Sequence, residues 1–200
     1  MEKQEKMLTL MREILQDDYL QLSVKLYSMT ESLEEEEPLC QLTCVLVNAD
    51  GSEMSVESSG VGVIDALFRG LRERLADEYP SLRSIRFSQF NIRGLISVQD
   101  GSSASRATAE ATVGIVNSEG VEFIFKSTAP SVSRAGIQAT VNAVDYFVNS
   151  EKTFVRLHEI LEHYRSEGRM DLVDKYTDLM SRVVSNTSYS EVVEKIKDSM

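Results

Sequence analysis

The side chains that most often carry out chemistry in proteins are scarce in this sequence. Its only histidines, His158 and His163, stand five residues apart in the segment HEILEH. Zinc proteases place two histidines four residues apart so that both rings share one helix face. Five residues instead rotate about 140° past a full turn, at roughly 100° per residue. We therefore expect both histidines on a helix surface and no metal between them.

The two cysteines also predict no reactive site. Cys40 and Cys44 lie in the apolar segment CQLTCVLV, which is typical of a strand. Four strand positions span about 13 Å at roughly 3.3 Å per residue, whereas the Cα atoms of a disulfide lie within about 7 Å. A metal pair would need further ligands, and no second Cys or His cluster supplies them. We interpret both as buried thiols and expect no metal, no cofactor and no catalytic residues.

A segment predicted to form two strands joined by a tight turn occurs twice in the sequence. Residues 40–60 match residues 109–129 at an offset of 69, and both copies contain an Asn-x-acid-Gly segment that is typical of a tight hairpin turn. A strand pattern precedes each copy and an apolar stripe at helical spacing follows it. The sequence therefore predicts an α+β fold of duplicated β-β-β-α units, with helices packed on antiparallel sheet.

The first strand of each unit is read from alternation. In YLQLSVKLYS the residues Leu20, Leu22, Val24 and Leu26 are expected on one face, and IRFSQFNIRGL alternates less regularly through Phe87. The run Glu34–Glu37 in the first unit is either a solvated loop or a metal or partner site.

Helices are predicted at both ends of the chain. One apolar stripe covers residues 2–16, and the helical pattern beyond residue 151 breaks at Gly168 and resumes, which indicates a helical hairpin. A last short helix is expected from Ser188, because Ser188 and Glu191 have capping-box spacing. The predicted parts are an N-terminal helix over 1–17, a domain over 18–150 built of units 18–80 and 81–150, and a helical extension over 151–200.

Composition excludes several classes of function. The 200 residues are 42 % hydrophobic, and 32 acidic against 21 basic residues give a formal charge of −11. Such a field repels phosphate backbones, so we expect no nucleic acid partner. No apolar segment has the length of a signal peptide core or a bilayer span. We expect a cytoplasmic protein without membrane contact.

Two segments carry a resemblance to a known family. SGVGVIDALFRGL and STAPSVSRAGIQATVNAVDYFVN, each after a three-strand unit, resemble the C-terminal regulatory domain of the 2-isopropylmalate synthase family, which includes citramalate and homocitrate synthases. The likeness covers about residues 18–150. It implies a dimerising module in which an amino-acid end product, such as leucine or isoleucine, binds near a pseudo-twofold junction and inhibits a separate catalytic barrel.

The resemblance has consequences for activity and partners. A (β/α)₈ barrel needs typically about 250 residues, more than this chain contains. We expect a non-catalytic protein that forms a homodimer and associates with a catalytic synthase subunit, or a domain cut from such a synthase. The amino end, MEKQEKMLTLMREIL, favours a stand-alone regulator.

The resemblance also implies an effector site at the two helix starts. Unpaired N–H groups there attract a carboxylate, and glycines let it approach closely. Matched to the family's motifs, the candidates are Gly60, Val61, Gly62, Val63 and Ile64 at the first start and Ser127, Thr128, Ala129, Ser131 and Ser133 at the second, with Phe87, Phe90 and Ala104 lining the rest. The family usually has proline where Val63 stands.

Alternatives stay open at this stage. The Gly-x-Gly of residues 60–62 is also explained by the backbone geometry of a strand-to-helix turn, and Asp65 by the helix dipole. A structural interaction module that has lost its ligand is the second functional hypothesis, favoured if Val61 and Val63 fill the junction. Arg69, Arg72, Arg74, Arg83, Arg86 and Arg93 either pair with neighbouring acids or form a docking patch for a second copy of the chain.

Overall fold

The computed structural model describes residues 2–32, 39–97 and 106–184. Its elements in chain order are α1 (Glu2–Leu15), η1 (Gln16–Asp18), β1 (Leu22–Ser32), β2 (Leu39–Asn48), β3 (Glu53–Gly60), α2 (Val63–Leu75), η2 (Pro80–Arg83), β4 (Arg86–Ser97), β5 (Arg106–Val116), β6 (Glu122–Ala129), α3 (Val132–Ser166) and α4 (Met170–Val184). The Glu34–Glu37 loop, Ala104 and the helix expected from Ser188 lie outside the described residues.

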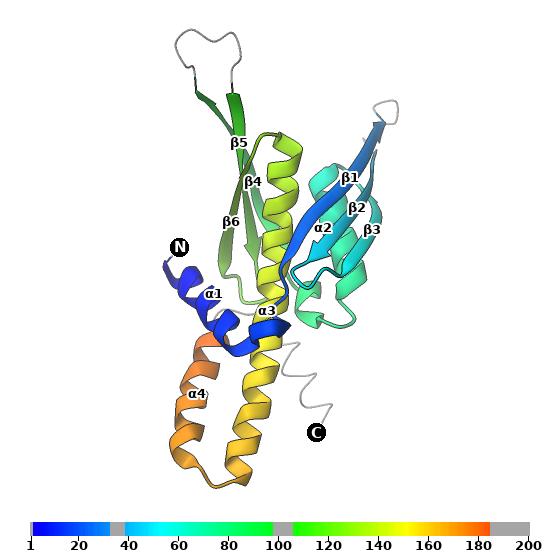
Figure 1. The fold of residues 1–200 in the computed structure, drawn as a ribbon. Coiled ribbons are helices and arrows are strands. Elements are labelled where there is room, and N and C mark those ends of the chain that lie inside the picture. The colour runs from blue at the N-terminus through cyan, green and yellow to red at the C-terminus, as the bar shows by residue number, and fades with distance from the viewer. Residues whose placement is uncertain (1, 33–38, 98–105, 185–200) are drawn as a thin grey trace.

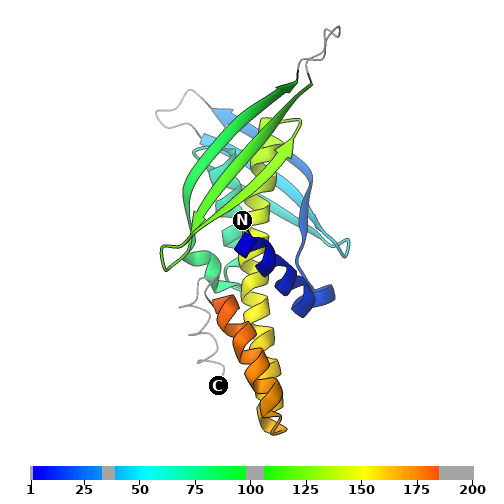
Figure 2. The same cartoon turned by 90° about the vertical axis from the view of Figure 1, so that its left-hand side faces the viewer.

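The predicted duplication is confirmed as two separate antiparallel sheets, ordered β1-β2-β3 and β4-β5-β6. Helix α2 packs on β2 and β3, whereas α3 packs on β5 and β6 and also contacts β1. Figure 1 shows α3 running between the two sheets, and Figure 2 shows the same helix continuing below them beside α4. The α+β prediction is therefore confirmed, with the two helices lying between the sheets.

Both hairpin turns have the geometry that the repeated segment predicts. Gly51 and Gly120 adopt φ of 85° and 79°, a left-handed conformation that glycine adopts without a steric penalty. Each donates its N–H to the first residue of its turn, Asn48 or Asn117, over 2.9 and 3.1 Å. The Asn117 side chain additionally accepts the N–H of Val121 at 2.9 Å. The repeated Asn and Gly residues therefore determine the geometry of both turns.

Each first strand contains a bulge at a corresponding place. The register with the second strand shifts between Val24 and Leu26 in β1 and between Phe87 and Gln89 in β4. Because a bulge adds one residue, the residues that follow it change faces. Leu26 is 65 % exposed, and the prediction that it shares a face with the apolar residues before it is wrong. Tyr27 takes the inner position instead.

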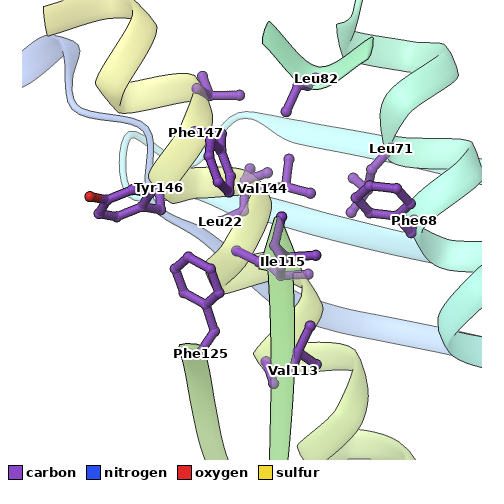
Figure 3. Packing of buried hydrophobic residues seen from close by; sticks show 14 of the residues in the cluster. Leu22, Phe68, Leu71, Leu82, Val113, Ile115, Phe125, Val144, Tyr146 and Phe147 are labelled. Atoms are coloured by element: carbon purple, nitrogen blue, oxygen red, sulfur yellow. The ribbon is translucent and has the colours of Figure 1, made fainter. Parts of the chain in front are cut away.

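The core joins both units through α3. Figure 3 shows Val113, Ile115 and Phe125 of the second sheet packing toward α3, with Phe68 of α2 on the far side. All four residues of the predicted stripe on α3 are buried: Ile137, Val141, Val144 and Val148. Burying one such side chain contributes about 1.5–3 kcal/mol. The two units therefore share one core.

Polar side chains on α3 fix the segments that cross it. Asn149 accepts the N–H of Leu20 at 2.8 Å and donates to its carbonyl oxygen at 2.7 Å. Asp145 accepts the N–H of Leu22 at 2.9 Å, and Glu151 accepts that of Ser81 at 3.0 Å. Buried backbone N–H groups need such partners. The start of β1 and the segment before β4 are therefore both tied to one helix.

The predicted helical hairpin is confirmed. Helix α3 ends at Ser166, Gly168 has φ of 69°, and Arg169 donates its N–H to the carbonyl oxygen of Tyr164 at 3.0 Å. Tyr164 and Tyr176 then stack across the hairpin with centroids 5.6 Å apart. One unbroken helix runs through residue 151, the position of the predicted domain boundary.

The cysteines lie on a strand and the histidines on a helix, as the sequence predicts. Cys40 and Cys44 are buried thiols without a disulfide between them, and burial raises the pKa of Cys44 to about 11. His158 and His163 lie on α3, and His163 Nε2 is 3.5 Å from Glu167 Oε1. Within the described ranges no cluster of His, Cys, Asp or Glu is placed to hold a metal ion. No described helix combines the length and apolar character needed to cross a bilayer.

Candidate functional site

The turn into α2 requires glycine for a packing reason. A Cβ at Gly60 would lie 2.4 Å from Asp65 Oδ2 and 2.6 Å from the backbone nitrogen of Ala66. The Asp65 carboxylate also accepts the N–H of Val61 at 3.2 Å. Asp65 therefore closes its own turn, and Gly60 makes room for it.

Gly62 leaves the start of α2 open. It is the N-cap residue, with φ −161° and ψ 174°, an extended conformation that any residue adopts. A Cβ added there would meet nothing within 4 Å. Glycine has no side chain to accept a hydrogen bond from the first-turn N–H groups, which have no intrahelical partner. The start of α2 therefore has no side-chain cap, and the space beside the Gly62 Cα is open.

The start of α3 has the same backbone and a different cap. Ser131 stands 69 residues after Gly62, and the bond from Ala135 N–H to its carbonyl oxygen has the same 2.9 Å length as that from Ala66 to Gly62. The Ser131 hydroxyl accepts the N–H of Arg134 at 3.4 Å. The second helix start therefore satisfies part of its own first turn.

Two candidate residues meet on α3. A Cβ at Gly136 would lie 2.8 Å from Ile64 Cδ1 and 3.2 Å from Phe90 Cζ. Because of the bulge in β4, Phe90 rather than Gln89 lies opposite the buried Val113 and so faces the helices. Phe90 is still 43 % exposed. We call Gly62, Ile64, Phe90 and Gly136 the junction, since they bring the open start of α2 beside two apolar side chains.

Other candidates lie away from the junction. Phe87 packs on Phe68 in the core, with ring centroids 4.5 Å apart. Val61 is 67 % exposed, so it does not fill the junction, whereas Val63 is half-buried against the core. Thr128 is exposed on the opposite face of β6 from its neighbours, because successive strand residues alternate.

The remaining candidates belong to the second helix start. Ser131 is exposed, Ser127 and Ser133 are half-buried, and Ala129 is buried. Ser127 lies opposite the buried Ala111 and therefore faces the helices. These residues surround the turn into α3 without an apolar pair like that of Ile64 and Phe90.

Sequence reasoning missed Gly136. It lies in a helix with a strong apolar pattern, where a glycine costs about 1 kcal/mol relative to alanine. That cost is the signal that the position has a packing role. The structure identifies the role as close contact with Ile64 and Phe90.

Several of the six arginines pair with acids. Arg69 lies 4.0 Å from Asp65 within α2, Arg83 lies 2.7 Å from Asp77, and Arg93 of β4 lies 3.4 Å from Glu110 of β5. Exposed pairs of this kind contribute about 0–1 kcal/mol. The pairing interpretation therefore accounts for these three arginines.

Comparison with known proteins gives two matches. The family model described as the LeuA allosteric (dimerisation) domain matches residues 3–148. The sequence is 25 % identical over 109 residues to a protein of Methanosarcina acetivorans named "Probable 2-isopropylmalate synthase". The aligned part is 54 % of this chain and 19 % of that relative. The chain is therefore similar to a small part of a much longer protein.

Proposed function

Because this chain belongs to the LeuA allosteric (dimerisation) domain family, we propose that it is a non-catalytic regulatory module that binds a branched-chain amino acid. In this proposal it forms a homodimer and associates with a catalytic synthase subunit. The observation that carries the proposal is the uncapped start of α2 beside Ile64 and Phe90.

The chemistry of the junction suits an amino acid with an apolar side chain. A carboxylate accepts hydrogen bonds from first-turn N–H groups and is stabilised by the positive end of the helix dipole. The aliphatic side chain then lies against Ile64 and Phe90, which removes apolar surface from water. Gly62 keeps the approach to the backbone open.

Exposed apolar side chains support a homodimer at the same end of the molecule. Val61 and Val132 flank the two helix starts and are 67 % and 52 % exposed, and Phe90 and Ile92 of β4 are 43 % and 40 % exposed. Figure 1 shows β4 and β5 continuing past the first turn of α3, where neither helix covers them. A second copy packed there would bury these side chains and enclose both helix starts.

A thermal-unfolding scan tests the effector. The purified chain is heated with leucine, isoleucine, valine, lysine or the related 2-oxo acids. A ligand at 100 times its Kd adds about 2.7 kcal/mol of stability, so the effector raises Tm by several degrees. If no compound shifts Tm while the dimer mass persists, the chain is instead a structural interaction module, and Val61 and Phe90 become parts of a protein contact.

Sedimentation equilibrium tests the dimer with two matched variants. Val61→Ser replaces an exposed valine at the proposed interface, and Val121→Ser replaces a valine of 43 % exposure at the β5–β6 turn. Only Val61→Ser should weaken association. If Val61→Ser and Val121→Ser show the same mass in solution, the dimer does not form through the surface around Val61.

A further inference from the structure

A second cavity lies apart from the junction. It is a cleft of about 530 Å³ between α1, the start of β1, β6 and α3, and none of the junction residues lines it. Figure 2 shows α1 crossing in front of α3 beside the lower end of the second sheet. Its walls combine the apolar side chains of Leu8, Leu22 and Phe125 with the polar groups of Asp145 and Tyr146.

Asp145 lines this cleft and carries a buried carboxylate oxygen without a hydrogen-bond partner among the described residues. The side chain is 8 % exposed, and its Oδ2 accepts the N–H of Leu22 at 2.9 Å. Its Oδ1 has no hydrogen-bond partner among the described residues. Burial raises the pKa of Asp145 well above its usual range. A buried acceptor left in this state is costly to the fold unless something binds it.

Tyr146 also lines the cleft and carries a second buried polar atom without a partner among the described residues. Its residue is 1 % exposed, and its ring packs against Phe123 and Phe125 with centroids 5.5 Å away in each case. Figure 3 shows the hydroxyl pointing away from the packed rings and aliphatic side chains. That hydroxyl has no hydrogen-bond partner within the part of the chain that the structure describes.

One of the two cations in the cleft wall contacts an aromatic ring. Arg12 lies over the ring of Tyr19, with its Cζ 5.3 Å from the ring centroid. Lys126, which also lines the cleft, is exposed on β6. The lining also includes the polar side chains of Gln21, Gln138 and Asn142, and its charged residues other than Asp145, which are Glu5, Arg12 and Lys126, are all exposed.

We propose that this cleft binds a small organic ammonium ion with an apolar body. The ammonium group donates hydrogen bonds to Oδ1 of the ionised Asp145 and to the hydroxyl oxygen of Tyr146, which gives both atoms the partner that they lack. Binding favours loss of the Asp145 proton, because an adjacent positive charge lowers the pKa that burial raises. The body lies against Leu8, Leu22 and Phe125. The site is separate from the junction and does not depend on effector binding there.

Isothermal titration calorimetry of the full chain tests the proposal. The probes are 3-methylbutylamine, the uncharged 3-methylbutan-1-ol and leucine. The amine should bind and the alcohol should not, because only the amine supplies a charge to Asp145. Leucine tests whether the cleft also accepts an ammonium group that belongs to an amino acid. If the amine binds and leucine does not, the ligand is a simple amine.

Three variants complete the experiment. Asp145→Asn keeps an acceptor for Leu22 N–H and should weaken amine binding by about tenfold or more, the usual scale of a lost charge-assisted hydrogen bond. Tyr146→Phe keeps the ring packing and should weaken it several-fold. Gly62→Ser, at the junction, should leave it unchanged.

The outcomes separate the two sites. Leucine binding that Asp145→Asn abolishes and Gly62→Ser spares assigns leucine to the cleft, which supports this proposal and contradicts the junction. Leucine binding that Gly62→Ser abolishes and Asp145→Asn spares supports the junction as the leucine site. In that case, amine binding to wild type and its loss in Asp145→Asn still support the cleft proposal. No amine binding to the wild type at millimolar concentration, or equal affinity in Asp145→Asn, overturns the proposal.

Discussion

The starts of α2 and α3 share one backbone and differ in what closes them. Both turns repeat at an offset of 69 with the same 2.9 Å first helical hydrogen bond. At α3 the Ser131 hydroxyl accepts an N–H of the first turn, whereas at α2 the cap is Gly62, which has no side chain. The comparison teaches that the duplication fixes the turn, and that the cap residue decides whether a helix start is available to a ligand.

Exchanging the residues two positions before each cap should give the largest effect. Gly60→Ala places a Cβ 2.6 Å from the backbone of Ala66, where no flexible side chain can yield. We expect a loss of about 3 kcal/mol, the upper part of the range for overpacking. Ala129→Gly, the matched change at the second start, should cost about 1 kcal/mol. Urea unfolding measures both.

The ranking of these two variants decides the result. A loss for Gly60→Ala no larger than that for Ala129→Gly would mean that the two turns are interchangeable. It would also remove the packing argument for Gly60.

The helices differ again at Asp145, whose counterpart at the offset of 69 is Ala76, the C-cap residue of α2. Because burial raises the Asp145 pKa, the folded state holds this proton more tightly than the unfolded state does. Its contribution to stability is complete below the ordinary carboxyl pKa of about 4 and is lost as pH rises through the folded pKa. Asp145→Asn should therefore match wild type at low pH and exceed it by roughly 1–3 kcal/mol above that window.

Unfolding free energies measured from pH 3 to pH 9 check the Asp145 prediction. A constant difference between variant and wild type over this range would contradict it, because the difference must grow with pH. Asn149→Asp, one turn along α3, offers the opposite change: it should destabilise the chain, since Asn149 donates to the carbonyl oxygens of Leu20 and Asp145.

Removing the α3 cap should have a smaller effect. Ser131→Ala deletes the acceptor of the Arg134 N–H, and we expect a loss of about 0.5–1 kcal/mol, since the 3.4 Å bond is long. The matched change Gly62→Ala deletes no acceptor but introduces a poorer N-cap residue, so it should cost somewhat less than Ser131→Ala. Chemical denaturation of both variants checks the order, which would be reversed if Gly62 had a structural role that its open surroundings do not reveal.

Adding a cap to α2 should give the smallest change in stability. Gly62→Ser copies Ser131 into a position where a Cβ meets nothing within 4 Å. We expect a gain of a few tenths of a kcal/mol together with weaker effector binding, because the hydroxyl competes for the first-turn N–H groups. If the folded Gly62→Ser chain binds the effector with unchanged affinity, the effector does not bind at the start of α2.

The sequence predicted the parts of the fold that local chemistry determines. Asn48 and Gly51 specify their turn through a hydrogen bond and a positive φ, and Gly168 specifies the end of α3 in the same way. The bulges were not predictable, because neither Lys25 nor Ser88 is a residue type that marks one. Leu26 was consequently assigned to the wrong face.

Buried polar residues limited the prediction of α3 and of its cleft. A helix with one apolar stripe is expected to expose the rest of its surface, but α3 lies between two sheets and buries Asp145 and Asn149 as well. Of the proposed site, Ile64 was a candidate through the family's first helix-start motif, and Phe90 was a candidate as a strand residue lining the rest of the pocket. Their contact with Gly136 depends on how α2, β4 and α3 pack together, which no local pattern encodes.

The most direct test of the account is a titration of the ¹⁵N-labelled chain with the amino acid that shifts Tm, followed through backbone amide resonances. We expect the amides of Val63, Ile64 and Asp65 to shift with saturating concentration dependence, while those of Val132, Ser133 and Arg134 change little. Equal shifts at both helix starts, or shifts that spare both, would contradict the claim that the cap residue makes one start available to a ligand.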